Sequence, residues 1–296
     1  MSETQTRDAT FYSGPSVRMA ATIYLPDAKT ANHGGIVFCH GFGGVRGGVP
    51  VGLSLRLAAA GYTVMAFDYR GFGQSDGHRA LLSPADQVED TVHALEFLAQ
   101  YPGVDKNKIG LYGTSFGGGV AALAAARSPR PKALIISVPV VSGTQWLRSL
   151  NRWYEFEEVK EKAFASLAKK VLTGEVEIVD RSDIMIPDPL SRIRYAEKLP
   201  MTQETVYHLL NHEPLDVAGK LRMPVKMFGV RDDSLVPYEQ TEQFFQSIQS
   251  PKDLTIFDRG NHWAVYDEAL SEVATGSIAW FGEHVLGAAG SRRSAS

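Results

Sequence analysis

Short apolar segments alternate with amphipathic helical patterns along most of this 296-residue chain, and this order restricts the fold more than any other feature. The apolar segments predicted to be buried strands are Ile36–Cys39, Tyr62–Phe67, Ile109–Tyr112, Ala133–Val138, Val225–Val230 and Leu254–Phe257. The helical patterns that follow them are Val51–Ala60, Pro84–Gln100, Phe116–Arg127, Pro237–Ile248 and Asp267–His284. Because strands joined by helical crossovers run parallel, we expect an α/β protein with a mostly parallel sheet and helices on both faces.

The alternation stops between residues 142 and 221, where the patterns Asn151–Leu172 and Thr202–Leu210 are helical and no strand is evident. Strand-like segments resume at Val225, so the sheet is expected to close around an insertion. We call residues 142–221 the cap and predict that it is helical. The predicted organisation is an α/β core of residues 1–141 and 222–288, the cap, and a flexible tail of residues 289–296.

Composition excludes several classes of function. The net charge of −3 and the pI of 6.3 provide no basic surface for nucleic acid, so no nucleic-acid partner is expected. Cys39 is the only cysteine, which excludes an internal disulfide and favours a reducing compartment. No apolar run approaches the ~20 residues of a membrane span, and residues 1–15 lack a secretory signal. A cytoplasmic protein without membrane contact is therefore expected.

The pentapeptide Gly113–Gly117 has the pattern G-x-S-x-G, with Ser115 at its centre. Flanking glycines allow a sharp turn that holds a nucleophilic serine in a strained conformation between a strand and a helix. The segment Lys108–Tyr112 before the pentapeptide is strand-like, and the small-residue helix Gly118–Arg127 follows it. This context predicts that Ser115 is a nucleophile.

The same pattern occurs a second time, at Gly73–Gly77, with Ser75 at its centre. Ser75 lies seven residues beyond Asp68, and no helical pattern begins before about Ser83. Because the strand–turn–helix context is missing, we interpret Ser75 as a turn residue without a catalytic role.

A nucleophilic serine needs a histidine to accept its proton and a carboxylate to orient that histidine. In enzymes with this serine turn the acid and then the base follow the nucleophile in the chain. Four histidines follow Ser115. His208 and His212 lie in the cap and His284 lies near the end of the last helix, whereas His262 lies in the turn after the last strand. His262 is the predicted base, and Asp232 and Asp233, after Val225–Val230, are the two candidate acids.

The oxyanion of the tetrahedral intermediate needs backbone N–H donors. Phe116 N–H is one predicted donor, and Phe42 N–H, in the glycine-rich loop His40–Gly44, is the other. We interpret His40 as a brace for this loop and Cys39 as a core residue. The residues predicted to contact substrate are Gly41, Trp146 and Trp263. For Trp146, which belongs to an aromatic cluster with Trp153, Tyr154 and Phe156, attachment of the cap is the alternative.

Taken together, these motifs resemble the α/β-hydrolase superfamily. They are His40–Gly44, Asp68–Ser75, Gly113–Gly118, Asp233–Pro237 and Gly260–Trp263. More narrowly, the chain is similar to the branch of serine aminopeptidase-like, dienelactone hydrolase-like and Xaa-Pro dipeptidyl peptidase-like proteins. The resemblance implies Asp233 as the acid, since related chains place it four residues before a helix-starting proline. Dienelactone hydrolases proper use a cysteine nucleophile, so Ser115 groups this chain with the serine members.

The sequence thus predicts a serine hydrolase with the triad Ser115, Asp233 and His262, acting on a small carboxylic ester or a related amide or thioester. The same triad is compatible with hydrolysis of a carbon–carbon bond in a 1,3-dicarbonyl compound and with peptidase activity. A ligand-binding protein that has lost catalysis is a third hypothesis. No metal or organic cofactor is expected, because no ligand cluster or phosphate-binding loop is evident. The expected partner is a small acyl substrate, and the sequence leaves homo-oligomer formation open.

Overall fold

A computed structural model of the chain describes residues 4–185, 188–194 and 197–287, and the predicted tail lies outside them. Eight strands form one sheet in the spatial order β1-β2-β4-β3-β5-β6-β9-β10. Their bounds are β1 Gln5–Ser13, β2 Val17–Leu25, β3 Gly35–Cys39, β4 Thr63–Phe67, β5 Ile109–Thr114, β6 Pro131–Ser137, β9 Val225–Val230 and β10 Lys252–Phe257. The pairs β1–β2 and β2–β4 are antiparallel, and all pairs from β4 to β10 are parallel. The predicted α/β fold with a mostly parallel sheet is confirmed.

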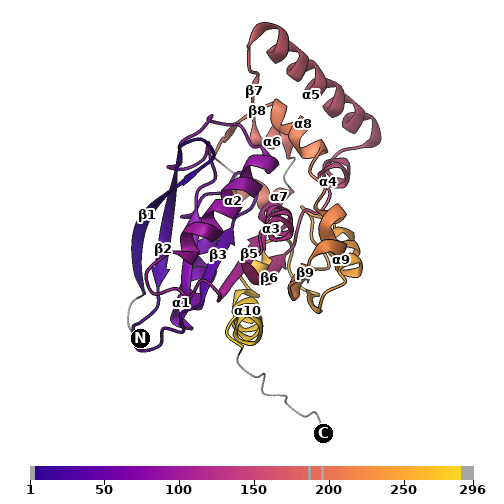
Figure 1. The fold of residues 1–296 in the computed structure, drawn as a ribbon. Coiled ribbons are helices and arrows are strands. Elements are labelled where there is room, and N and C mark those ends of the chain that lie inside the picture. The colour runs from indigo at the N-terminus through magenta and orange to yellow at the C-terminus, as the bar shows by residue number, and fades with distance from the viewer. Residues whose placement is uncertain (1–3, 186–187, 195–196, 288–296) are drawn as a thin grey trace.

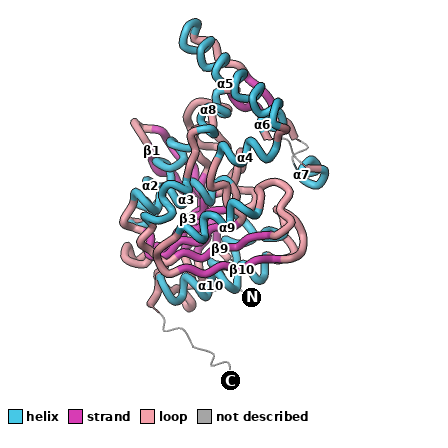
Figure 2. The backbone as a smooth tube through the Cα atoms, turned by 90° about the vertical axis from the view of Figure 1, so that its right-hand side faces the viewer, coloured by secondary structure: helices cyan, strands magenta, loops and turns pink. Residues whose placement is uncertain are grey.

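Helices cover both faces of the sheet (Figures 1 and 2). They are α1 Pro50–Ala59 and α10 Leu270–His284 on one face, and α2 Pro84–Ala99, α3 Phe116–Arg127 and α9 Tyr238–Ser247 on the other. Side chains alternate along the strands, so Phe38 of β3 joins the core with Leu57 and Phe281, whereas Val37 joins the core with Leu95. Each central strand is therefore buried on both faces, as its continuous apolar sequence requires.

The antiparallel hairpin β1–β2 was not predicted. β1 forms one edge of the sheet, and most of its nine residues are exposed and polar. The turn uses Gly14 and Ser16, which have φ angles of +50° and +65°. A half-exposed edge strand does not need a continuous apolar run, so the sequence signal used for the central strands is absent here.

The cap leaves the sheet after β6 and returns to it at β9. Its helices are α4 Gly143–Leu150, α5 Trp153–Thr173, α6 Arg181–Ile184, α7 Pro189–Arg194, α8 Glu204–Leu210 and the 3₁₀ helix η1 Pro214–Lys220. The sequence shows no clear strand in the cap, but the structure has two, since β7 (Ile178–Asp180) and β8 (Pro200–Thr202) form a separate antiparallel pair. Strands of three residues are too short to give a recognisable alternation. The cap bounds at residues 142 and 221 stay a prediction.

The two ends of the cap are fastened to each other beside the sheet. The backbone N–H of Gly143 donates to the His212 carbonyl at 2.7 Å, and the N–H of Leu215 donates to the Val141 carbonyl at 2.9 Å. The side-chain oxygen of Gln240, on α9, accepts the N–H of Val141 at 2.8 Å. The chain therefore enters and leaves the cap through one hydrogen-bonded neck.

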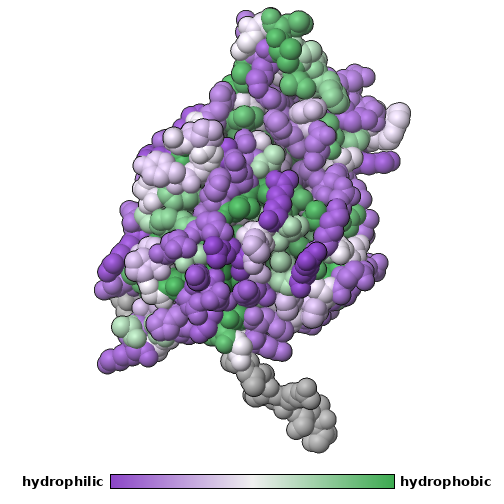
Figure 3. Space-filling model, in the orientation of Figure 1, coloured by the Kyte–Doolittle hydropathy of each residue, from purple (hydrophilic) through white to green (hydrophobic). Residues whose placement is uncertain are grey.

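Helix α5 projects from the tip of the cap, far from the sheet (Figure 1). Its buried residues are Phe156, Ala163 and Ser166. Apolar side chains such as Val171 and Leu172 are instead exposed, and Figure 3 shows apolar surface gathered at this tip. Among the described residues, no helix is both long and apolar enough to cross a lipid bilayer.

Candidate active site

Ser115 forms the sharp turn between β5 and α3. Its φ of +53° and ψ of −127° lie in a strained region for a residue with a side chain. The flanking glycines are required by space, because a Cβ on Gly113 would lie 2.4 Å from the Gly117 carbonyl oxygen. A Cβ on Gly117 would lie 2.3 Å from the His40 carbonyl oxygen. The turn places Ser115 in the wall of a cavity at the carboxyl edge of the sheet.

The structure brings Ser115, His262 and Asp233 into one hydrogen-bonded chain. The Nε2 atom of His262 lies 3.1 Å from Ser115 Oγ, and its Nδ1 atom lies 2.7 Å from Asp233 Oδ2. The side chains of His262 and Asp233 are only 3% and 2% exposed, so water competes little for these bonds. A proton on Nδ1 donates to Asp233 and leaves Nε2 as the acceptor for the serine hydroxyl.

The two candidate acids differ in their surroundings. Asp233 Oδ1 accepts the backbone N–H groups of Leu235 and Val236 at 2.9 and 2.8 Å, which turns Oδ2 toward His262. Asp232 is exposed. Of the two, the structure brings only Asp233 to the histidine.

Ser75 lies in a different environment from Ser115. It is fully buried, and its hydroxyl donates to the Asp68 carbonyl at 2.5 Å and accepts the Ala20 N–H at 2.9 Å. The first bond closes the turn after β4, and the second joins this turn to the neighbouring strand β2. This geometry suits a structural serine.

The glycine-rich loop after β3 runs directly past Ser115. A Cβ on Gly41 would lie 3.2 Å from Ser115 Cβ and 3.5 Å from its Oγ, so the loop backbone is in contact range of the serine. The next residue, Phe42, therefore has its backbone beside Ser115. Phe116 is the first residue of α3, where a helix provides no internal acceptor for the N–H. The two predicted oxyanion donors thus flank Ser115 along the chain and across the loop.

Trp146 packs on these phenylalanines. Its ring centroid lies 5.4 Å from that of Phe42 and 6.1 Å from that of Phe116, and its Nε1 donates to the Leu235 carbonyl at 2.8 Å. Trp146 is 1% exposed and is not among the described residues that line the cavity. In the structure its indole attaches the cap to the core.

The cavity beside Ser115 has a volume of about 190 Å³. Its lining includes Gly41, Phe42, Ser115, His262, Trp263, Tyr266 and, from the cap, Arg181. It is smaller than the roughly 300–1,000 Å³ clefts that hold drug-sized ligands. The site therefore has room for a small acyl group.

Trp263 lies under cap helix α7. Its Nε1 donates to Ser191 Oγ at 2.9 Å, and the Arg194 guanidinium lies 4.5 Å from the centre of its ring. Arg194 also forms an ion pair with Asp267. These contacts join the cap to the turn that carries His262.

Cys39 ends the strand β3, and His40 follows it at the start of the glycine-rich loop. His40 is 2% exposed, and its Nδ1 lies 3.1 Å from the Gly41 carbonyl oxygen. Its ring packs against Tyr69 in a T-shaped arrangement with the ring centroids 4.7 Å apart. Burial lowers the pKa of His40 and raises the pKa of the Cys39 thiol to about 11. A neutral histidine and a protonated thiol fit the predicted bracing and core positions.

Comparison with known proteins decides the family. The sequence pattern described as serine aminopeptidase, S33 matches residues 30–269. The chain belongs to this family. The predicted resemblance to the α/β-hydrolase superfamily is thereby confirmed, and membership of the serine aminopeptidase S33 family supports an enzyme with hydrolase activity.

Proteins that are similar to this chain differ in how they are described. An uncharacterized 31.7 kDa protein in the traX-finO intergenic region of Escherichia coli is 29% identical over 285 residues, which cover 90% of this chain and 96% of that protein. The thiohydrolase aneE of Aspergillus aculeatus is 25% identical over 273 residues, 85% of each chain. A solved structure of DcsB in complex with its substrate analogue superposes with a TM-score of 0.85 at 19% identity, covering 95% of this chain and all of that one. This structural likeness supports the fold.

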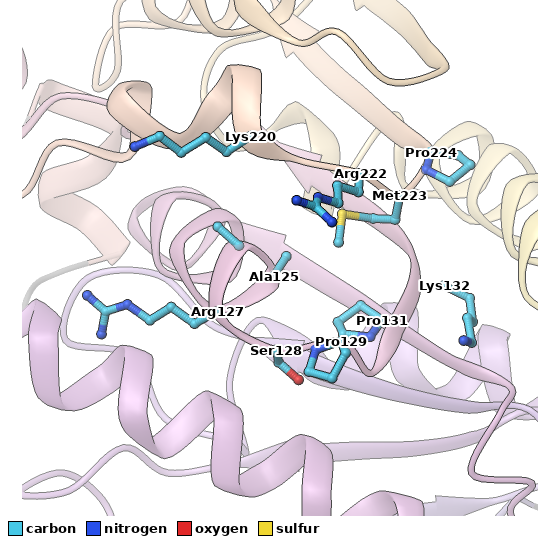
Figure 4. Close-up of a pocket in the computed structure, with 11 residues that line it drawn as sticks. Ala125, Arg127, Ser128, Pro129, Pro131, Lys132, Lys220, Arg222, Met223 and Pro224 are labelled. Carbon is cyan, nitrogen blue, oxygen red and sulfur yellow. The ribbon is translucent and has the colours of Figure 1, made fainter.

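A larger cavity lies at the opposite end of α3 (Figure 4). Its volume is about 780 Å³, and the basic residues in its lining are Arg127, Lys132, Lys220 and Arg222. Helix α3 has twelve residues and so separates this cavity from Ser115 by about 18 Å. In this serine aminopeptidase S33 member the larger cavity is therefore separate from the serine site.

Sequence reasoning missed several residues that line the serine site, and Tyr266 and Arg181 are two of them. The hydroxyl of Tyr266 and the Oγ1 of Thr114 share a hydrogen bond of 2.6 Å, which joins the turn that carries His262 to the residue before Ser115. Its position four residues after His262 is a signal that was available. Arg181 comes from the cap, where no motif identifies it.

His212 provides a test of stability against pH. It is 1% exposed, its ring lies 4.5 Å from that of Phe116, and no described residue hydrogen-bonds to its ring nitrogens. Burial lowers its pKa to about 3, whereas the unfolded value is about 6.5. Below pH ~6.5 His212 is therefore protonated in the unfolded chain and neutral in the folded protein. The free energy of unfolding then falls by up to ~1.4 kcal/mol per pH unit as the pH drops toward 3.

We expect His212→Leu to flatten this loss of stability. Urea unfolding of the wild type and the variant at pH 7, 5.5 and 4.5 measures the slope of the unfolding free energy. His78→Leu, which replaces an exposed histidine, is the matched control and is expected to keep the wild-type slope. Equal slopes in His212→Leu and wild type would contradict the prediction.

Proposed function

We propose that this protein hydrolyses small carboxylic esters or thioesters through an acyl-enzyme on Ser115. The observation that carries the proposal is the unbroken chain of hydrogen bonds from Ser115 Oγ through His262 to Asp233, beside a glycine-rich loop and a small cavity. A buried histidine held between a serine and a carboxylate is the arrangement that activates a hydroxyl for acyl transfer.

In the proposed reaction His262 Nε2 takes the hydroxyl proton while Ser115 Oγ attacks the substrate carbonyl. Asp233 holds the imidazole in the required tautomer and stabilises its charged form. The N–H groups of Phe42 and Phe116 bind the oxyanion. His262 then gives its proton to the departing alcohol or thiol as the bond to the carbonyl carbon breaks. A water molecule repeats the sequence, and its attack releases the carboxylic acid and restores Ser115.

The substrate class follows from the site and from the relatives. The cavity of about 190 Å³ favours a short acyl chain, and the cap supplies part of its lining. We include thioesters because the Aspergillus aculeatus relative, aligned over 85% of this chain, is a named thiohydrolase. Cap residues are proposed to limit substrate size, and Trp263 and Gly41 to contact the acyl group.

A fluorophosphonate probe tests the nucleophile without knowledge of the substrate. Such a probe reacts covalently with an activated serine, so we expect labelling of the folded protein and modification of the peptide that contains Ser115. Absence of labelling on folded protein would favour a ligand-binding protein that has lost catalysis.

The choice between ester and thioester needs a matched pair of substrates. We expect turnover of the N-acetylcysteamine thioester of butanoic acid and of its oxygen-ester analogue, measured as acid release at constant pH. The ratio of their kcat/KM values identifies the preferred leaving group. A 1,3-diketone or a peptide cleaved faster than both would contradict the proposed substrate class.

A further inference from the structure

Four basic side chains surround the cavity at the end of α3 that is remote from Ser115. They come from four separate segments: Arg127 ends α3, Lys132 is in β6, Lys220 ends η1, and Arg222 lies in the loop before β9. All four are exposed, and Figure 4 shows them spaced around the cavity. The dipole of α3 provides a partial charge of only about −0.5 at this end, which is small beside four positive charges. The cluster is therefore more than a cap for the helix.

These four side chains form no hydrogen bond or ion pair within the part of the chain that the structure describes. Neighbouring cations differ from them. Arg130 binds the two carboxylate oxygens of Glu96 at 2.8 and 2.7 Å, and Lys226 forms an ion pair with Asp253. No acidic residue is among the described residues that line the cavity. The cavity thus presents four positive charges with which no described side chain pairs.

The charge of the cavity favours a ligand with several negative charges. A hollow lined by one sign of charge concentrates ions of the opposite sign, and the repulsion among its cations is relieved when an anion binds. Arginine donates two parallel hydrogen bonds to a phosphate group, and lysine binds phosphate as a point charge. A phosphate monoester carries about 1.5 to 2 negative charges at pH 7. Two phosphate groups therefore approach the charge of the four cations.

The size and the wall of the cavity favour a ligand with an organic part. The volume of about 780 Å³ lies within the range of roughly 300–1,000 Å³ that is typical of sites for small organic molecules. Apolar side chains complete the wall, and they are Ala125, Pro129, Pro131, Met223 and Pro224. Such a wall packs against an apolar or flat group, and methionine adapts its shape to the group that it contacts. A simple inorganic anion would leave this part of the cavity unused.

We propose that this cavity binds an organic diphosphate of about the size of a nucleoside diphosphate. The phosphate groups bind to the basic side chains, including Arg127 and Arg222, and the organic part lies on the proline and methionine side chains of the wall. Helix α3 separates the cavity from Ser115 by about 18 Å. The proposed site is therefore distinct from the serine site, and it does not depend on the reaction proposed there.

Calorimetric titration of the wild-type protein at about 0.15 M NaCl, a salt concentration that screens weak surface attraction, tests the ligand class with four probes. They are ADP, inorganic diphosphate, adenosine and sulfate, each used without divalent metal ions. We expect ADP to bind more tightly than diphosphate, and adenosine and sulfate to bind at least about tenfold more weakly than ADP. Absence of saturable binding by ADP and diphosphate would overturn the proposal. Equal binding of sulfate, diphosphate and ADP would also overturn it and would indicate an adventitious ion only.

Paired variants test where ADP binds. Arg127→Gln/Arg222→Gln is expected to weaken ADP binding at least about tenfold, because hydrogen bonds assisted by charge are lost. Arg127→Lys/Arg222→Lys is expected to retain part of the affinity, since the charges remain. Arg7→Gln/Arg148→Gln removes two exposed arginines of β1 and α4 and so changes the net charge equally, and it is expected to bind ADP as the wild type does. Equal weakening in the two glutamine pairs, or loss of ADP binding in Ser115→Ala, would overturn the proposal.

Discussion

Replacing Ser115 with alanine is expected to lower kcat by about 10⁶-fold, because the acyl-enzyme cannot form without its nucleophile. The alanine removes one hydroxyl from the strained turn and leaves the flanking glycines and the fold in place. Turnover of a p-nitrophenyl ester, with circular dichroism as a check on folding, measures the effect.

The second G-x-S-x-G serine is the matched control. Ser75→Ala removes two buried hydrogen bonds to backbone atoms, so it is expected to reduce stability by about 1–3 kcal/mol. The folded fraction should retain most of the wild-type kcat. Loss of activity in folded Ser75→Ala, together with an active Ser115→Ala, would overturn the assignment.

Asp233→Asn is expected to reduce kcat by about 10⁴-fold while the protein stays folded. The amide oxygen is able to keep the two N–H bonds from Leu235 and Val236, which leaves the NH₂ group facing His262 Nδ1. A donor at this position favours the histidine tautomer with its proton on Nε2, and that tautomer does not accept the serine proton.

Asp232→Asn changes the neighbouring, exposed carboxylate in the same way and is the control. We expect its kcat to stay within about twofold of the wild type, since surface substitutions of this kind have small effects. If the two variants lost activity equally, Asp233 would have no special relation to His262.

The central sheet was predictable because its signal is physical and local. Strands buried on both faces need continuous apolar runs, and parallel neighbours need crossover helices, so Val37 and Phe38 identify β3 although they face different layers. Ser115 was distinguished from Ser75 by the strand and helix on either side of it. These features depend on consecutive residues, so they can be recognised in the sequence alone.

Other parts of the molecule depend on contacts between distant segments. The edge strand β1 is stabilised by pairing with β2, and β7 finds its partner β8 some twenty residues later. Arg181 reaches the serine cavity only because the cap folds back over the loop at Gly43. Neither composition nor the periodicity of apolar residues indicates that the cap folds back over this loop. Trp146 shows the converse, since its aromatic ring suggested a substrate contact and the structure buries it against Phe42.

The hydrogen-bonded neck between residues 141–143 and 212–215 joins the two ends of the cap beside the sheet, so the cap can change in evolution independently of the core that carries the triad. Segments of other lengths and sequences are able to start and end at this neck without moving any strand that carries a triad residue. Arg181 belongs to the exchangeable part, whereas Ser115, Asp233 and His262 belong to the framework. Exchange of the cap alone would therefore change part of the cavity lining while Ser115, Asp233 and His262 stay in place.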